Sequence, residues 1–470
     1  MIIDNEFKRI FLITVDCLRA DVVGCIGGGN LTPYIDRFAQ KSLLFERAFA
    51  NGPGTNQSFP AILTSTYFLM HGGMRLSPRY TTLAEVLRRN GFKTVGFHSN
   101  PFLSKILGWD RGFDEFYDYM GIIKSPSAFV TQQQGSGLRN TVTRFLTTCL
   151  GASRNAKTQR LLKKIYYHFS GLEIPYLEGK NLNNQVSDWI EKNLDQPFFL
   201  WMHYMDPHYP YIPPEPFLKV FSSRNEAFNF NISADDNNPS KEELETFREL
   251  YNGEVRYTDN CIGKMIEFLE SKELLDDSLV VFTADHGHAF MEHGRFGHAY
   301  DILYNEVLHV PLLIYGLGFS KSIDVPVELL SVPPTITDIF DLKKPQSFMG
   351  ASLTRQIEGR EKKAPIISES ANPDQINLRY DTNEKAVSCI LGDWKLIVNE
   401  MLGSTGLYDI RRDFGEKNNV ATDEQKKLGE LKLLIQKHFI TEKLRKMGPI
   451  PGKSSTNLKS SLRQLPSSGN

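Results

Sequence analysis

Four of the eleven histidines in this chain lie close together in one polar segment, TADHGHAFMEHGRFGHAY. The segment follows an apolar run, so it is expected at the end of a buried strand, where open α/β sheets bind their ligands. An acid and a histidine side by side at a Gly-containing turn can bind one cation together, and polar clusters of this density usually mark sites. The candidate residues of this segment are Asp285, His286, His288, Glu292, His293 and His298.

Two more polar clusters follow apolar runs. Asp16, in LITVDCLRAD, comes directly after a predicted strand and is well placed to bind a metal, although a turn or helix-capping role fits it equally well. The segment HYMDPHYPYIPP holds His203, Asp206 and His208 in a Pro-rich loop, which would fix substrate-contacting side chains. Taken alone, a histidine here is more often a packed loop residue.

A candidate nucleophile lies in the segment NGPGTNQSFPAILTS, where a Gly/Pro-rich turn leads into a predicted helix from about Phe59. Thr55 and Ser58 both lie at the mouth of that helix, whose free N–H groups favour an anionic oxygen or a phosphoryl group. Ser58, directly before the helix, is an ordinary N-cap, and we assign it that role. Thr55 is therefore the candidate nucleophile.

Strand-like and helix-like runs alternate around these clusters, which predicts an α/β layered domain. The expected strands are Ile10 to Val15, Lys93 to Phe97, Pro197 to Tyr204, Leu279 to Thr283 and Pro311 to Tyr315. The expected helices are Pro33 to Lys41, Leu83 to Asn90 and Glu242 to Lys272.

The chain divides into segments of different character. Residues 1–365 form the expected catalytic domain, and they include a stretch, residues 119–172, with eight basic and no acidic side chains and a basic helix around Leu161 to Phe169. Short strand patterns within residues 366–447 predict an antiparallel C-terminal subdomain closed by a helix. Residues 448–470 are rich in Gly, Pro, Ser and Lys and are expected to be disordered.

The composition is that of an ordinary globular protein: 470 residues, 41% hydrophobic and 23% charged. A formal net charge of −1 gives no indication of nucleic-acid binding. Five scattered cysteines without CxxC spacing argue against a disulfide framework or a thiolate zinc site and suit a reducing compartment. The apolar run at Ile10 to Val15 is too short for a signal peptide, and no later run spans a bilayer, so a soluble, cytoplasmic protein is expected.

These motifs together resemble the sulfatase family of the alkaline phosphatase superfamily over nearly the whole chain. The resemblance rests on LITVDCLRAD, LTPYIDRFAQKSLLFERAFAN, TLAEVLRRNGFKT, RGFDEFYD, DPHYPY, TADHGH, HVPLLIYG and GDWKLIVNE with GLYDIRRDFGEKNNVA. Each motif is moderately specific, but their order is very specific. The resemblance implies an α/β fold in which a large mixed β-sheet lies between helical layers, with a small C-terminal antiparallel sheet.

The resemblance also implies roles for individual residues. The metal ligands would be Asp16, Thr55, Asp285 and His286, with Thr55 also the nucleophile. The substrate-contacting residues would be His203, His208, His293 and His298, of which His208 and His298 match catalytic contacts to the ester's non-bridging oxygens. This oxygen and nitrogen set suits one divalent ion, with Mn²⁺ favoured and Ca²⁺ or Zn²⁺ as alternatives. Cys17 would favour a softer ion if it faces the site, but a small buried hydrophobe is expected there.

Two departures from the family bear on the reaction. Sulfatases convert a Cys or Ser in C/S-x-P-x-R into formylglycine, whereas this chain has Thr55, Gln57 and Phe59 in TNQSF, so no formylglycine is expected. Cys17 stands where the family has the second of two paired acids. A Thr nucleophile and a single acid resemble the phosphoglycerol and phosphoethanolamine transferases of the superfamily.

A phosphate-type ester is therefore the expected substrate, because phosphothreonine can be hydrolysed by in-line attack or passed to an alcohol. A sulfated threonine lacks the second hydroxyl with which formylglycine hydrate expels sulfate. The alternatives are a sulfuric ester hydrolase acting on a carbohydrate or aryl sulfate, and a catalytically silent sulfatase-like binding protein. The substrate would be a small-molecule, glycan-linked or lipid-linked anionic ester, and the basic stretch would be either a peripheral membrane contact or a solvated helix.

Overall fold

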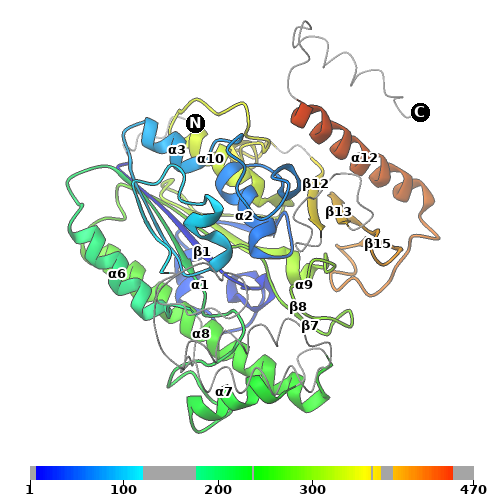
Figure 1. The fold of residues 1–470 in the computed structure, drawn as a ribbon, viewed down its shortest axis with the longest axis horizontal. Coiled ribbons are helices and arrows are strands. Elements are labelled where there is room, and N and C mark those ends of the chain that lie inside the picture. The colour runs from blue at the N-terminus through cyan, green and yellow to red at the C-terminus, as the bar shows by residue number, and fades with distance from the viewer. Residues whose placement is uncertain (1–6, 120–175, 235–237, 361–363, 372–384, 448–470) are drawn as a thin grey trace, which may run out of the picture.

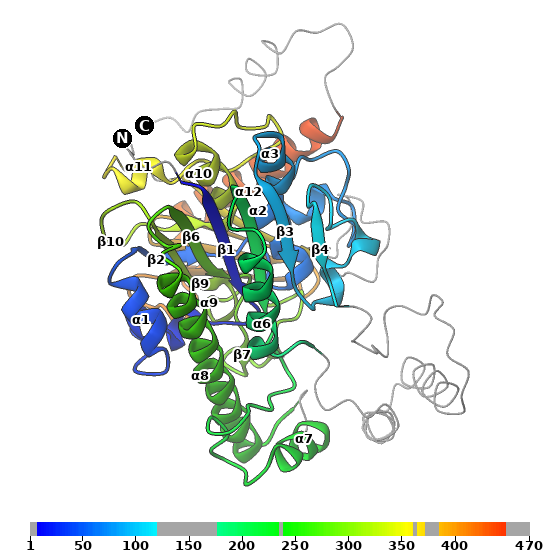
Figure 2. The same cartoon turned by 90° about the vertical axis from the view of Figure 1, so that its left-hand side faces the viewer.

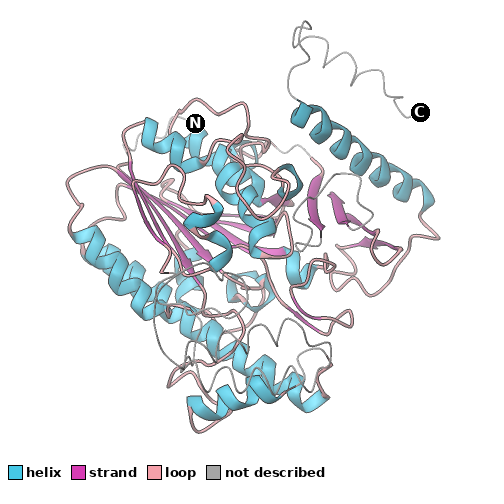
Figure 3. Ribbon diagram, in the orientation of Figure 1, coloured by secondary structure: helices cyan, strands magenta, loops and turns pink. Residues whose placement is uncertain are grey.

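The computed structural model describes residues 7–119, 176–234, 238–360, 364–371 and 385–447. The basic helix expected around Leu161 to Phe169 and the tail after residue 447 lie outside these described residues. A large sheet lies between two layers of helices, and a small sheet with a long helix lies to one side (Figure 3). The fold class is the one that the sequence predicts.

The main sheet has nine strands in the described part of the chain, in the order β10-β2-β9-β6-β1-β5-β3-β4, with β11 beside β2. Its centre is parallel, whereas β9 runs antiparallel to both β2 and β6, so the sheet is mixed. The strands are β1 (Arg9–Val15), β2 (Leu43–Phe49), β3 (Lys93–Phe97), β4 (Glu115–Tyr117), β5 (Phe198–Tyr204), β6 (Ser278–Ala284), β9 (His309–Tyr315), β10 (Lys321–Ile323) and β11 (Val327–Glu328). A separate short hairpin pairs β7 (Ala289–Phe290) with β8 (Phe296–Gly297).

The central strands form where the sequence is apolar on both faces. Every residue of β1, β5 and β6 is buried, which explains their continuous hydrophobic runs. The register pairs Val15 of β1 with Tyr204 of β5 on one side and with Ala284 of β6 on the other. Since the three strands are parallel and end side by side, the residues that follow them share one edge of the sheet.

Helices cover both faces of the main sheet (Figure 1). Helices α1, α6 and α8 lie together on one face, and α2, α3 and α10 lie on the other (Figure 2). The helices are α1 (Pro33–Ala39), α2 (Thr55–Thr64), α3 (Leu83–Arg89), α6 (Gly179–Glu191), α7 (Arg224–Ser233), α8 (Lys241–Ser271), α9 (Asn305–Leu308), α10 (Val332–Ile339), α11 (Thr354–Ile357) and α12 (Gln425–Met447). Short 3-10 helices are η1 (Ala20–Val22), η2 (Gly24–Ile26), η3 (Phe68–Met70), η4 (Pro101–Leu103), η5 (Lys105–Leu107) and η6 (Leu329–Ser331). Among the described residues, no helix combines the length and apolar character needed to span a bilayer.

A small antiparallel sheet follows the main sheet along the chain. Its strand order is β12-β13-β14-β15, and α12 packs against β13 and β14. A buried ion pair helps to fix this sheet to the main body: Nζ of Lys395 lies 2.8 Å from Oε1 of Glu416 and donates to Oδ1 of Asn305 in α9. The strands are β12 (Ile366–Ala371), β13 (Lys385–Leu391), β14 (Trp394–Asn399) and β15 (Ser404–Asp409).

Helix α2 begins earlier than the sequence suggests. It starts at Thr55 with Gly54 as its N-cap, so the assignment of Ser58 as the N-cap is wrong. Ser58 lies inside the helix with its hydroxyl buried. Pro60 lies inside the helix, although proline is more common at the first helical position. The correction places Thr55 itself at the helix N-terminus.

Candidate active site

Two carboxylates meet where β1 and β6 end. Asp16 follows β1 and Asp285 follows β6, and both side chains are fully buried. The Asp285 amide donates to the last carbonyl of β1 at 3.2 Å, which brings the two residues together. The turn after Asp285 requires glycine, because a Cβ on Gly287 would lie 2.3 Å from the carbonyl oxygen of Glu306. This turn presents Asp285 and the adjacent His286 to one point, as a shared cation requires.

Thr55, the first residue of α2, lies beside these acids. Its Oγ1 is 3.3 Å from Oδ2 of Asp16 and 3.4 Å from Nε2 of His286. Only 5% of Thr55 is exposed, and the residue lines a cavity of about 340 Å³. The hydroxyl therefore lies between the buried acids and a space large enough for a small substrate.

The imidazole of His286 turns a lone pair toward both acids. Its Nδ1 lies 2.9 Å from the carbonyl oxygen of Gly287, which can only accept, so Nδ1 carries the proton and Nε2 does not. Nε2 lies 3.7 Å from Oδ1 of Asp16 and 3.5 Å from Oδ2 of Asp285. A lone pair and two carboxylates facing one another are unfavourable unless a cation lies between them.

His203, near the end of β5, has the same arrangement. Its Nδ1 lies 2.9 Å from Oγ1 of Thr14. The Thr14 hydroxyl donates to the carbonyl of Met202 at 3.2 Å and accepts from the indole of Trp201 at 3.0 Å, so it must accept from His203 as well. Nε2 of His203 is left without a proton, 3.4 Å from Oδ2 of Asp16. His203 thus lies beneath the cavity with the acids, rather than in the cavity wall.

Three atoms of this cluster are buried without a hydrogen-bond partner among the described residues: Oδ1 of Asp16, Oδ2 of Asp285 and Nε2 of His203. One ligand atom from each of these three residues lies within 4.8 Å of the others. Because buried polar atoms are nearly always paired, such a group indicates a missing cationic partner. Carboxylate oxygens and imidazole nitrogens together fit a divalent ion of the Mn²⁺ or Zn²⁺ type.

The electrostatics of the two acids point the same way. Burial opposes the ionisation of Asp16, but positive charge facing it, that of His208 first, holds the pKa of Asp16 well below its usual range. Burial, and then the charge of Asp16, raise the pKa of Asp285 well above its usual range. A cation between the two acids would relieve this repulsion, so the donor set fits a bound metal.

Asn100 belongs to the same cluster, although the motif analysis missed it. Its Nδ2 donates to Oδ2 of Asp16 at 2.9 Å and lies 3.2 Å from Oγ1 of Thr55. The signal in the sequence was its position: Asn100 follows the predicted strand Lys93 to Phe97, which ends at the same edge of the sheet as the acids. This amide links the acid to the hydroxyl and holds both in place.

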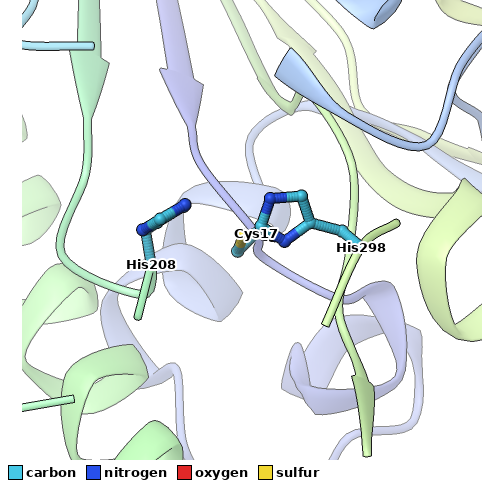
Figure 4. Close-up of side chains that lie close together, drawn as sticks. All are labelled: Cys17, His208 and His298. Atoms are coloured by element: carbon cyan, nitrogen blue, oxygen red, sulfur yellow. Dashed lines mark hydrogen bonds between the residues drawn. The ribbon is translucent and has the colours of Figure 1, made fainter. Parts of the chain in front are cut away.

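Cys17, His208 and His298 lie together at the mouth of the cluster (Figure 4). Sγ of Cys17 is 3.5 Å from Nδ1 of His298. The thiol is buried as expected, and burial together with Asp16 and Asp285 raises its pKa well above the usual range, so it is neutral. Cys17 therefore faces the site as a soft, uncharged group.

The cavity above Thr55 has polar and aromatic walls. Asn100, His208 and His298 contribute polar groups to its wall. Its aromatic residues are Phe102, Tyr176 and Tyr300. Nδ1 of His208 lies 2.5 Å from the carbonyl of Tyr209, which can only accept, so Nδ1 carries a proton. None of the described residues that line the cavity is a lysine or an arginine.

The structure does not bring every residue of the histidine-rich segment to this cavity. His293 stacks on Tyr304 and bonds to Glu306 and to the Glu416 carbonyl, so it joins the main body to the C-terminal part of the chain. The other residues outside the cavity bond elsewhere: His288 to the Tyr211 hydroxyl, Glu292 to Arg19 and Arg248, and Asp206 to the Gly179 amide. His293 therefore contacts other parts of the protein and does not line the cavity.

A mixed sheet that gathers acids, imidazoles and one hydroxyl beneath a cavity defines an α/β ester hydrolase. The chain matches the Sulfatase family over residues 8–342, and it belongs to the sulfatase family of the alkaline phosphatase superfamily. It is 24% identical to arylsulfatase K of Mus musculus over 433 residues, covering 83% of this chain and 72% of that protein. Among solved structures, it is similar to a phosphonate monoester hydrolase from Silicibacter pomeroyi, with a TM-score of 0.66, 20% identity and coverage of 93% and 95%. A 2-O GAG sulfatase gives a TM-score of 0.65, 18% identity and coverage of 93% of each chain.

Proposed function

We propose that this protein is a metal-dependent hydrolase or transferase that cleaves a phosphate-type ester with Thr55 as nucleophile. The observation that carries the proposal is the position of the Thr55 hydroxyl. It lies within 3.4 Å of a buried acid and of an imidazole whose lone pair faces two acids. Such a cluster directly beneath a cavity suits a nucleophile that is activated by a bound cation.

The metal ligands in this proposal are Asp16, Thr55, Asp285 and His286, and the geometry adds His203. When bound, one divalent ion, with Mn²⁺ favoured, would lower the pKa of the hydroxyl and neutralise charge on the reacting oxygens. Asn100 holds the Asp16 carboxylate through its 2.9 Å hydrogen bond and so keeps this donor set in place.

The reaction follows from the positions of the side chains. Oγ1 of Thr55 loses its proton to solvent in the cavity and attacks phosphorus, the bond from phosphorus to the leaving oxygen breaks, and the leaving oxygen takes up a proton from solvent. Water or an alcohol then attacks phosphothreonine in line and restores Thr55. His208 and His298, on the cavity wall, contact the non-bridging oxygens and stabilise the charge that develops there.

Two features favour a phosphorus ester with a single negative charge. The described cavity wall lacks lysine and arginine, so it suits a monoanion such as a phosphodiester or a phosphonate monoester better than a dianion. A monoanionic sulfate ester has the same charge, but a sulfated Thr55 has no second hydroxyl to expel sulfate. The aromatic residues of the wall would bind an aryl or glycan leaving group by its face.

A sulfuric ester hydrolase that uses Thr55 without formylglycine is the second candidate function. The family match favours this candidate, because the relatives of this chain include arylsulfatase K and iduronate 2-sulfatase. A catalytically silent binding protein is a third candidate. It is disfavoured by the convergence of Asp16, Thr55, Asp285 and His286, since a silent copy has no need of such a cluster.

The test is hydrolysis of matched p-nitrophenyl sulfate, phosphate, phenylphosphonate and bis-phosphate esters by the wild-type protein and by Thr55→Ala, with Mn²⁺, Ca²⁺ or Zn²⁺. Turnover of the phosphorus monoanions by the wild type, lost by at least about a thousandfold in Thr55→Ala, is expected. Preferential, Thr55-dependent turnover of the sulfate would establish the second candidate instead. Absence of both turnover and bound metal would leave the binding protein.

A further inference from the structure

A second group of potential metal ligands lies far along the chain from the candidate active site. Glu369 comes from β12, and His438 and Glu442 come from α12. The two α12 residues are four positions apart and so lie on one face of the helix. That helix packs along the small sheet, away from the strand ends of the main sheet (Figure 1).

The three side chains converge on one point. Nε2 of His438 lies 3.0 Å from Oε2 of Glu369 and 3.5 Å from Oε2 of Glu442. Both glutamates are fully buried, and the ring of Tyr67 lies edge to face with the imidazole at 4.5 Å. Tetrahedral bonds of about 2.1 Å would place ligand atoms roughly 3.4 Å apart, so these separations suit a zinc-sized ion.

Among the described residues, hydrogen bonds reach the carboxylate of Glu369 but not that of Glu442. Both oxygens of Glu442 are buried without a hydrogen-bond partner among the described residues. Oε1 of Glu369 accepts from the amide of Leu69 at 2.7 Å, which leaves Oε2 for the cluster. The ammonium of Lys446 donates to the carbonyl of Leu69 at 2.6 Å. The single proton of Nε2 can serve Glu369 at 3.0 Å, but it cannot serve Glu442 as well.

We propose that Glu369, His438 and Glu442 bind one divalent cation of the Zn²⁺ class, which fastens α12 to β12. The ion gives the Glu442 carboxylate, which accepts no hydrogen bond, a partner. The site is structural, because its ligands join the last described helix to the main body through Leu69 of η3. It is independent of the reaction proposed for Thr55.

Metal stoichiometry tests this site. The full-length protein is stripped with a chelator, loaded with Zn²⁺, desalted and measured by mass spectrometry of the metal. Wild type is expected to hold two ions per chain, and Glu442→Gln and His438→Gln one each. Asp285→Asn, which changes the other cluster, is also expected to hold one. Glu430→Gln, on an exposed part of α12, is the matched control and is expected to hold two.

Two further measurements test whether an ion binds at this site. Zn²⁺ added to stripped Asp285→Asn is expected to raise Tm by several degrees, and Co²⁺ loaded into the same variant should give visible absorption that Glu442→Gln abolishes. An equal ion count in wild type, His438→Gln and Glu442→Gln overturns the proposal. A second outcome also overturns the proposal: metal-free Glu442→Gln is more stable than metal-free wild type, and Zn²⁺ stabilises neither protein. That result would mean that a shared proton, rather than an ion, joins the side chains.

Discussion

Oγ1 of Thr14 lies 2.9 Å from Nδ1 of His203, and this contact decides which ring nitrogen carries the proton. The hydroxyl has already donated its hydrogen to the Met202 carbonyl, so it acts toward His203 only as an acceptor. Nε2 of His203 consequently faces Asp16 with a lone pair. Thr14 does not line the cavity, but it thereby determines that Nε2 of His203 is the nitrogen available to bind a metal.

Replacing Thr14 with valine should therefore weaken metal binding. Valine keeps the volume but removes the acceptor of His203, so the imidazole is free to rotate or to change tautomer. We expect Mn²⁺ affinity to fall by about 10- to 100-fold, as measured by Mn²⁺ electron paramagnetic resonance titration. Thr283→Val is the control, because Thr283 pairs with Thr14 in register but its hydroxyl donates to the Pro311 carbonyl. Equal losses in the two variants would contradict the role of Thr14.

Cys17 should influence which metal is preferred. It has a left-handed backbone (φ 59°), a conformation that aspartate tolerates, and its Sγ faces the site. Cys17→Asp adds a hard oxygen ligand, so affinity for Ca²⁺ relative to Zn²⁺ should rise by roughly tenfold or more. Competition titrations would measure the ratio, with Cys17→Ser as the uncharged control. An unchanged ratio in Cys17→Asp would show that residue 17 does not reach the ion.

Asn100 should matter for turnover more than for metal content. Asn100→Ala removes a donor that lies against both Asp16 and Thr55, so the nucleophile loses its alignment. We expect kcat to fall by about 10- to 1,000-fold, with Mn²⁺ still bound. Asn51→Ala removes a buried amide that bonds to Glu328 and to the Ile367 carbonyl, and it should cost stability but not kcat. Parallel loss of metal and activity in Asn100→Ala would instead indicate collapse of the site.

Asp206 should make stability depend on pH. Burial raises its pKa from the ordinary value of 3.8 to about 7. The folded state therefore binds more protons than the unfolded state between about pH 4 and pH 7, so stability falls as pH rises through that window and then levels off. Through Asp206, the free energy of unfolding of the wild type should fall by about 2 kcal/mol between pH 5 and pH 8. Asp206→Asn should not show this part of the fall. Urea unfolding measures it, and exposed Asp188→Asn in α6 should keep the wild-type slope.

The fold could be predicted from the sequence where burial is complete. Strands β1, β5 and β6 are apolar along their whole length because both faces are covered, and their predicted bounds agree with the structure to within two residues. Strand β2 was not predicted from its hydrophobic pattern, since Glu46 and Arg47 interrupt it. Strands β10 and β11 are too short to leave a periodic pattern.

The site was less predictable because side-chain partners lie far apart in the sequence. Asp16 and Asp285 follow strands that the sequence revealed, and the parallel register brings them together. His293 lies in the same polar segment as His286 but pairs with Glu306 and with a carbonyl more than a hundred residues away. The residues next to His293 in the sequence do not indicate these distant partners.

Phe59 lies in an aromatic cluster beside the candidate active site. In the family motif this position is an arginine, but here the ring is fully buried and stands edge-on to His203 at 5.1 Å, against Trp109 and Trp201. An arginine restored at this position would place a charge among aromatic rings, and it would do so whatever residue occupied position 55. The packing around Phe59 thus makes the effect of a substitution at this position depend on its neighbours Trp109, Trp201 and His203, which is epistasis within one aromatic cluster.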